Sequence, residues 1–348
     1  MPDPERLERC LGRAPNFEGG ITLDLHGLDS IDISDNGTIA KVGTGATWDA
    51  VYKKLDPMGR SVAGGRVAGV GVGGLTLGGG ISHLPCRRGW TCDTVLNFQA
   101  VLSNGEIVNA NAKENADLFF ALRGGSNNFG IVTRIDLETF EQGFLWSASL
   151  AFGTSVLDAD VKEFVRLSAD KDFDQDASFL LSLAYIGSMG ASLVVNTLVH
   201  AQPVENPPVY AGFKTMTALS VETEKMVPKG ARSLFRTCTV VSTEAMVHAA
   251  YDAWSESVSA IANAPGISWV LSFDRLPSKF YARHAETNAF GMGNRNDKPL
   301  LVALLDVRWS EAADDNVINS AAKALFDKVR HALLSTIHVE DDSSLIRW

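Results

Sequence analysis

The feature that most constrains the fold is a glycine-rich segment in the first third of the chain. Nine of the seventeen residues from Gly64 to Gly80 are glycine. Glycine loses more backbone freedom on folding than any other residue, so a long helix or strand built from this segment would be costly. Glycine also lets another group approach the main chain closely. The segment therefore indicates a site where a flat or charged cofactor lies against bare peptide.

Part of this segment satisfies the G-x-G-x-x-G spacing of dinucleotide-binding folds, at Gly69, Gly71 and Gly74, and Asp93 follows about twenty residues later. A Rossmann fold needs a strand before these glycines and a long helix after them. The preceding residues are a poor strand, and the helix would contain Gly78–Gly80, each costing about 1 kcal/mol relative to alanine. The sequence therefore disfavours a Rossmann fold. A structural turn without a ligand is the remaining alternative to a cofactor site.

Composition excludes several other classes of function. A formal net charge of −10 is typical of a protein that does not bind nucleic acid, because phosphate binding needs a concentrated basic surface. No apolar run reaches the roughly 18 residues of a membrane helix, and the charged N-terminus lacks the apolar core of a secretory signal. We therefore expect a cytoplasmic location. We expect no metal site, because the four cysteines form no C-x-x-C pair and are predicted to be thiols: Cys10, Cys86, Cys92 and Cys238.

The order of predicted elements indicates an α+β protein. Residues 1–20 are expected to be irregular, residues 21–143 to form one domain, and residues 144–348 to form a lobe with an antiparallel sheet covered by helices. In the first domain we predict strands at 21–25, 39–43 and 131–140, a hairpin over 98–110 with its turn at Asn104-Gly105, and helices after Thr47 and from Asp117. In the lobe we predict helices over about 156–169, 243–263 and 312–334, and strands at 146–153, 178–186, 191–200, 267–273 and 299–309.

Several blocks of sequence, taken together, resemble one known family. These blocks are VGTGATWDAVY, GGRVAGVGVGGLTLGGGIS, RRGWTCDTV and ADLFFALRGGSNNFGIVTRIDL. Residues from about 20 to 140 are similar, with the spacing intact, to the PCMH-type FAD-binding domain of the vanillyl-alcohol-oxidase superfamily. Within it, the berberine-bridge-enzyme-like FAD-linked oxidases are the nearest group. The resemblance implies this FAD-binding domain followed by a substrate-binding lobe.

The resemblance also implies which residues meet FAD. It places Gly71, Gly73, Gly74, Gly78, Gly79 and Gly80 along the diphosphate and the isoalloxazine ring. It places Gly130, Ile131 and Val132 at the adenine-ribose end. Successive backbone N–H groups in tight turns bind anions without a lysine, which suits a chain this acidic. Asp93 is expected to brace the loop.

The chain departs from the family pattern at both ends, as if truncated. No Arg-x-Gly-Gly-His segment, which carries the flavin-linked histidine, precedes residue 21, and His26 and His83 lack that context. Val67 stands where some members have a cysteine linked to the flavin, so any FAD is expected to bind non-covalently. The family's final segment with its catalytic groups is not matched either. An incomplete gene model, a degenerate paralogue and a non-redox protein are the open explanations.

The function implied by the resemblance is that of an FAD-dependent oxidoreductase. It would transfer hydride from a small, largely apolar compound of secondary metabolism to the flavin, with O₂ as the electron acceptor. The alternative is a non-redox flavoprotein remnant that binds a small molecule or a partner chain. Tyr185, Tyr281 and Asp306 are candidates for the catalytic base by position, but no catalytic residue is assigned. The sequence does not name the substrate or the oligomeric state.

Overall fold

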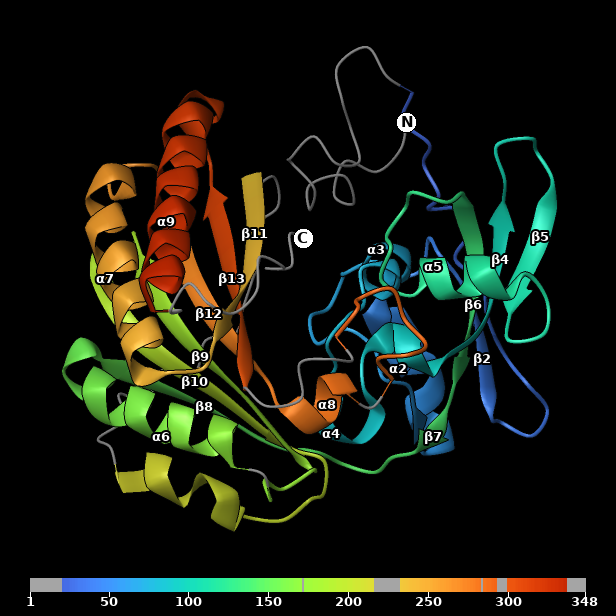
Figure 1. The fold of residues 1–348 in the computed structure, drawn as a ribbon, viewed down its shortest axis with the longest axis horizontal. Coiled ribbons are helices and arrows are strands. Elements are labelled where there is room, and N and C mark those ends of the chain that lie inside the picture. Colours follow the sequence, from blue (N-terminus) through green and yellow to red (C-terminus); the bar gives the residue numbers. More distant parts are fainter. Residues whose placement is uncertain (1–20, 171, 216–231, 283, 293–298, 337–348) are drawn as a thin grey trace.

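The structure is a computed structural model that describes residues 21–170, 172–215, 232–282, 284–292 and 299–336. Its two halves, each built on an antiparallel sheet, lie side by side (Figure 1). The first half holds the glycine-rich segment. The second half is the larger α+β lobe, so the predicted fold class is confirmed.

The first half is a five-stranded sheet with short helices packed on it. Its strand order is β1-β2-β6-β4-β5. Buried side chains from the helices and the strands meet in one core, which includes Trp48, Val72 and Phe98. The strands are β1 (Ile31–Ile33), β2 (Ile39–Gly43), β4 (Val95–Val101), β5 (Ile107–Asn111) and β6 (Ile131–Glu138), and the helices are α2 (Trp48–Leu55), α3 (Val72–Leu77), α4 (Pro85–Arg88) and α5 (Ala116–Leu122). A short ladder joins β3 (Arg60–Ser61) to β7 (Phe140–Glu141).

The lobe is a six-stranded antiparallel sheet in the order β11-β13-β12-β9-β10-β8. Three long helices cover one face of this sheet, and its other face is turned toward the first half (Figure 1). The strands are β8 (Trp146–Gly153), β9 (Ala177–Ile186), β10 (Ala191–His200), β11 (Arg232–Val241), β12 (Ser268–Leu276) and β13 (Leu300–Trp309). The helices are α6 (Leu157–Ala169), α7 (Glu244–Ile261), α8 (Ser278–Ala282) and α9 (Asp315–Thr336).

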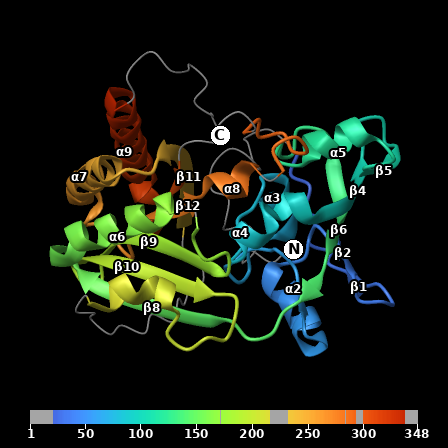
Figure 2. The ribbon, with the colours of Figure 1, turned by 60° about the horizontal axis from the view of Figure 1, so that its bottom comes forward.

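Residues that follow β12 tie the lobe to the first half. Helix α8 lies beside α4 in both views (Figures 1 and 2). The Trp90 ring packs on Phe280 and Phe290, with centroid distances of 4.7 and 4.8 Å. The Asn288 amide donates to Asp93 at 2.9 Å. The two halves therefore share a small apolar core of their own.

The periodicity of the sequence predicted most of these elements correctly. The 98–110 hairpin is β4–β5, and its turn glycine, Gly105, has φ +84° as the turn requires. The predicted strand at 21–25 is wrong, because these residues have no strand assignment. Ile21 and Leu23 are exposed, so their alternation buries no face and has nothing to stabilise it. Residues 1–20 lie outside the described part of the chain.

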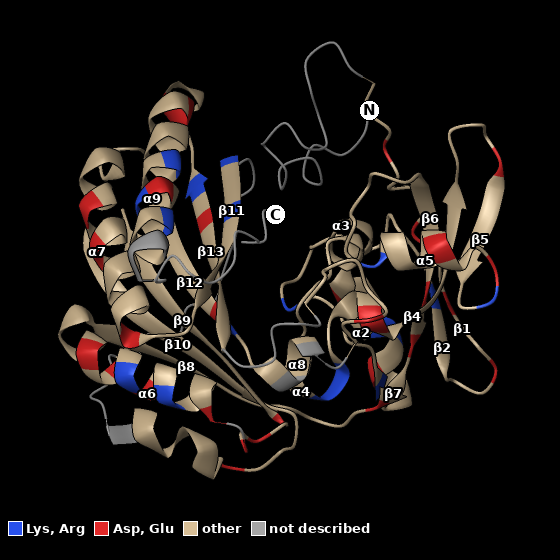
Figure 3. Ribbon diagram, viewed as in Figure 1, with Lys and Arg blue, Asp and Glu red and all other residues tan. Residues whose placement is uncertain are grey.

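Acidic and basic side chains are mixed along two of the long helices of the lobe (Figure 3). Along α6 and α9, Lys and Arg are interspersed with Asp and Glu (Figure 3). Within the described residues, no helix combines the length and apolarity needed to cross a bilayer. Cys86, Cys92 and Cys238 are thiols that form no disulfide within the described residues, as predicted, while Cys10 lies outside them.

Candidate functional site

The glycine-rich segment begins against a tryptophan. A Cβ atom added to Gly64 would lie 2.2 Å from the Trp48 ring, and one added to Gly65 would lie 2.4 Å from it. These two glycines are therefore required by packing inside the first half. No cofactor is needed to explain them.

Three later glycines form an exposed stripe on one side of α3. Gly71 immediately precedes the helix, Gly74 lies in its first turn and Gly78 follows it, and all three are exposed. Residues three and four apart share one face of a helix, so these positions line up. Among the described residues, a Cβ atom at Gly71 or Gly74 would meet nothing within 4 Å, and one at Gly78 would meet only backbone oxygens of the same helix. The side chains missing here leave open space, which is what a cofactor lying on bare peptide requires. We call these three residues the glycine stripe.

The other predicted cofactor glycines of this segment face inward. A Cβ atom at Gly73 would lie 3.0 Å from the Thr44 side chain. One at Gly79 would lie 2.4 Å from the Phe290 ring, and one at Gly80 would lie 2.6 Å from Thr91 Oγ1. Gly79 and Gly80 also have φ values of +103° and +76°, which L-residues rarely adopt. Packing and backbone conformation therefore give these positions a reason to be glycine, and their contact with FAD stays a prediction.

The second predicted loop lies next to the first. The Thr44 hydroxyl donates to the Val132 carbonyl at 2.7 Å, so Gly73 and Val132 are joined through one side chain. Ile131 is exposed beside them, and Gly130 has φ +148° with its Cα facing the Val101 carbonyl. The fold thus brings the two predicted ends of the cofactor site to neighbouring positions.

Asp93 braces the loop that follows the glycines, as predicted. Its carboxylate accepts hydrogen bonds from the Trp90 backbone N–H and from Asn288, both at 2.9 Å. Burial raises the pKa of Asp93, although these hydrogen bonds oppose the shift. The residue is therefore a structural contact between the two halves.

A buried charged cluster lies where the glycine-rich segment meets the lobe. The Arg66 guanidinium donates two hydrogen bonds of 2.6 Å to the Asp274 carboxylate of β12. Burial, reinforced by the positive charge of Arg66, lowers the pKa of the neighbouring His83 to about 4. The buried Nδ1 of His83 has no hydrogen-bond partner. His83 is therefore a neutral imidazole at pH 7, and its Nδ1 atom is buried beside the Arg66–Asp274 pair.

The sheet face that bears Asp274 is short of charge near its centre. Ser272 lies opposite Ser182 of β9, and their hydroxyl oxygens are 2.8 Å apart. Leu180 and Leu304 share this face by strand register. The arrangement suits a ligand that is largely apolar and carries few hydrogen-bonding groups. We call this the open face of the lobe sheet.

The three candidate bases fall in different places. Tyr185 packs on the helix-covered core, because it lies opposite the fully buried Trp269. Tyr281 is fully buried in the apolar core between the halves. Asp306 lies opposite Val270, on the open face, with its carboxylate 3.3 Å from Arg308.

Two further features lie away from the glycine stripe. A surface cavity of about 390 Å³ is lined by Arg60, Arg87, Glu141 and Gln202, among others. Near it, donor atoms of Asp174, Asp176 and His200 lie within 4.8 Å of one another. Because Arg87 already pairs with Asp176, a cationic group occupies part of this cluster.

Sequence comparison identifies the class of protein. Residues 10–111 match the FAD binding domain family. The FAD-dependent monooxygenase tpcD of Cochliobolus heterostrophus is 33% identical over 338 residues, covering 90% of this chain and 65% of tpcD. The oligopeptidase PhomG′ of Diaporthe leptostromiformis is 41% identical over 271 residues, covering 74% of this chain but 22% of that protein. The chain thus spans less than two thirds of the length of either relative.

Solved structures agree on the fold. The 6-hydroxy-D-nicotine oxidase of Arthrobacter nicotinovorans superposes with a TM-score of 0.70 at 18% identity, covering 91% of this chain and 72% of that one. The BBE-like 1 protein of Physcomitrella patens gives a TM-score of 0.69 at 18% identity, covering 88% and 70%. The chain therefore carries an FAD binding domain at residues 10–111 and shares the fold of these proteins, a PCMH-type FAD-binding fold. The resemblance seen in the sequence blocks is therefore confirmed.

Sequence reasoning missed the residues that join the two halves. Arg66 and Asp274 are 208 positions apart, and nothing local in either segment predicts that they pair. Phe290 is likewise an ordinary apolar residue in the sequence. One feature of the sequence did point to Asp274. It is a charged residue in a largely apolar strand, and such a residue needs a partner when it is buried.

Proposed function

We propose that this chain is an FAD-dependent oxidase that binds FAD non-covalently along the glycine stripe. FAD, when bound, accepts a hydride from a substrate carbon and is reoxidised by O₂. The single observation that carries the proposal is the exposed, Cβ-free side of α3 at Gly71, Gly74 and Gly78. No contact with the described residues requires glycine at these three positions, unlike at Gly64, Gly65 and Gly79.

The protein's own residues would supply binding and orientation. The backbone at Gly73 and Gly74 belongs to the first turn of a helix, where amides have no acceptor within the helix and can meet a diphosphate. Gly130, Ile131 and Val132 would meet the adenine-ribose end. No lysine is required, which is consistent with a formal net charge of −10.

The substrate would be a small, largely apolar metabolite held on the open face of the lobe sheet. Ser182 and Ser272 offer hydroxyl groups there. Related fungal proteins include FAD-dependent monooxygenases such as CTB5 of Cercospora nicotianae, which is 39% identical over 203 residues. This supports a role in oxidative secondary metabolism.

Proton removal from the substrate would need a group on the open face. Of the three bases considered, Asp306 is the one that lies there. The neutral imidazole of His83, beside the Arg66–Asp274 pair, is a second possible acceptor. Either group would hold the proton that leaves as the hydride is transferred.

The test begins with purified protein. We expect it to carry, or to take up stoichiometrically, FAD that gives visible flavin absorption and is released by acid denaturation. Bound FAD should be reduced anaerobically by a substrate alcohol or amine and reoxidised by O₂ with formation of H₂O₂. Colourless protein that takes up no added FAD would contradict the proposal and favour the non-redox alternative.

A further inference from the structure

The Arg66–Asp274 ion pair is unusual because it joins the two halves of the molecule through buried charges. The exposed fractions of the two side chains are 15% and 7%. Both hydrogen bonds are 2.6 Å long and form the bidentate geometry that a guanidinium and a carboxylate prefer. The contact is therefore strong and directional.

Asp274 reaches this position from the open face of the lobe sheet. Alternate residues of a strand point to opposite faces, and Leu271 and Phe273 point into the helix-covered core. Asp274 therefore shares the face of Ser272, two residues earlier in the strand. At about 3.4 Å per residue, the Cα atoms of Ser272 and Asp274 are about 7 Å apart.

Arg66 lies in the middle of a short segment that leads into the glycine stripe. The Tyr52 hydroxyl donates to the Gly65 carbonyl at 3.0 Å, and Asp49 accepts from the Gly69 N–H at 2.5 Å. Both of these contacts lie within the first half. The segment is thus held at each end by its own half and in the middle by the lobe, and Gly71 follows two residues later.

Stability alone is a weak reason for such a pair. Desolvating two charges costs several kcal/mol per ion, and well-packed apolar residues in place of a buried ion pair are often as stable or more so. The positive charge of Arg66 also disfavours protonation of His83 nearby. What apolar residues cannot reproduce is the direction of two parallel hydrogen bonds.

We infer that the Arg66–Asp274 pair is a positioning contact: it holds residues 66–71 in the shape that binds FAD, so that cofactor affinity depends on the docked lobe. Asp274 itself is placed as a positioning residue that acts through Arg66. The part of this inference that concerns affinity rests on the proposed function. The part that concerns order in residues 66–71 does not.

The decisive variant replaces both charges, Arg66→Met with Asp274→Leu. Each single replacement leaves one buried charge unpaired, so both singles should be clearly destabilised. The double variant should recover a Tm close to that of the wild type. If the pair positions the segment, amide hydrogen exchange of residues 66–71 in the double variant stays at least about tenfold faster than in the wild type, and its Kd for FAD stays at least about tenfold weaker.

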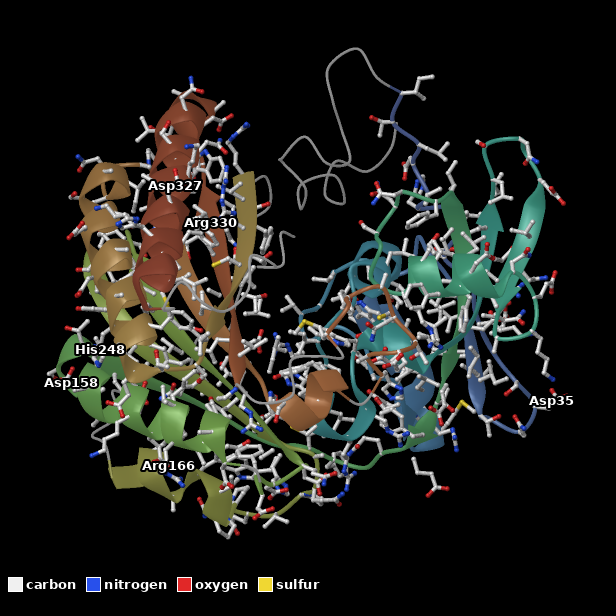
Figure 4. The ribbon with its side chains drawn as sticks, viewed as in Figure 1. Asp35, Asp158, Arg166, His248, Asp327 and Arg330 are labelled. Atoms are coloured by element: carbon white, nitrogen blue, oxygen red, sulfur yellow. The ribbon has the colours of Figure 1, made fainter. Side chains whose placement is uncertain are left out.

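Two further variants keep the test decisive. Arg66→Lys retains the charge but loses the bidentate geometry, so it should fold and show the same faster exchange even if the double variant fails to fold. Arg166→Met removes an ion pair between the exposed Arg166 and Glu163 on α6, far from the Arg66–Asp274 pair (Figure 4), and should change neither exchange nor affinity.

Two results would overturn the inference and leave the pair purely structural. One is a double variant with wild-type Tm, hydrogen exchange and FAD affinity. The other is wild-type hydrogen exchange in Arg66→Lys. Exchange is measured without FAD. If the wild type binds no FAD, the proposed function fails, while the exchange rates still decide whether Asp274 orders residues 66–71.

Discussion

At the scale of single residues, Asp160 of α6 is a carboxyl group with little compensation for its burial. It is fully buried and accepts one hydrogen bond of 2.6 Å from Asn196 on β10. Its other oxygen and the Asn196 Oδ1 have no hydrogen-bond partner in the part of the chain that the structure describes. Burial raises the pKa of Asp160 to about 6, and nearby Glu163 adds to the shift. Asp160 therefore binds its proton more tightly in the folded protein than in the unfolded chain.

We predict that Asp160→Asn stabilises the protein at neutral pH. A carboxyl with a raised folded pKa lowers stability progressively as the pH rises from the unfolded pKa, and the loss is complete above the folded pKa. From an ordinary value of 3.8 to about 6, the effect is on the order of 2–3 kcal/mol above pH 6 and vanishes below about pH 4. Urea unfolding at pH 4 and pH 8 measures it.

The matched control is Asp158→Asn on the same helix, where the side chain is 95% exposed (Figure 4). This control should change the free energy of unfolding little at either pH. Equal stability of Asp160→Asn and wild type at pH 8 would show that the buried carboxylate is compensated.

His83 carries the opposite pH dependence. Its folded pKa is lowered from 6.5 to about 4, so the unfolded chain binds a proton that the native state rejects. Its contribution to stability is therefore complete above about pH 6.5 and is lost as the pH falls toward 4. NMR titration of the imidazole should place its midpoint near pH 4. A midpoint near 6.5 would mean that the ring is hydrated and unsuited to the role proposed here.

At the scale of elements, helix α3 contains a glycine, Gly74, that lowers its stability and that packing against the described residues does not require. Gly74 lies inside a helix, where glycine is about 1 kcal/mol less favourable than alanine, and a Cβ atom there would meet nothing within 4 Å. Gly74→Leu should therefore raise the free energy of unfolding by about 0.5–1 kcal/mol. The same change should weaken FAD binding at least about tenfold, because the side chain covers the stripe.

Thermal unfolding and FAD titration of this variant give the two results independently. Ser320→Leu places the same side chain at an exposed position of α9 in the lobe and should leave FAD affinity unchanged. Undiminished affinity in Gly74→Leu would contradict the assignment of the stripe.

Element by element, the fold could be predicted where local pattern and burial agree. The β4–β5 hairpin was predictable because Asn104-Gly105 specifies a tight turn, and α7 because its apolar periodicity extends over eighteen residues. The predicted strand at 21–25 failed because alternation says nothing about whether a face is covered. Similarly, a run of glycines does not show which members face outward. That distinction needed the positions of Trp48, Thr44 and Phe290.

At the scale of the whole molecule, Phe290 links the glycine turns of the first half to the lobe. Its ring fills the space beside both Gly79 and Gly124, where added Cβ atoms would lie 2.4 and 2.6 Å away. We predict that Phe290→Ala lowers the free energy of unfolding by about 3–5 kcal/mol, the range for a buried phenylalanine. Phe235→Ala, at an exposed position of β11, should have a small effect.

Denaturant unfolding measures both variants. A loss below about 1 kcal/mol for Phe290→Ala would show that the contact is loosely packed and that the halves associate mainly through other residues. Contacts of this kind, like Arg66–Asp274, join residues more than a hundred positions apart. They were not predictable from one sequence because local patterns carry no information about which distant segments meet.

The central claim is that FAD lies on the bare peptide of α3. Hydrogen exchange of the wild-type protein with and without FAD tests it most directly. The account predicts slower exchange on FAD binding in residues 71–78 and 130–132, with little change in α7 and α9. FAD binding that leaves residues 71–78 unprotected would contradict the account.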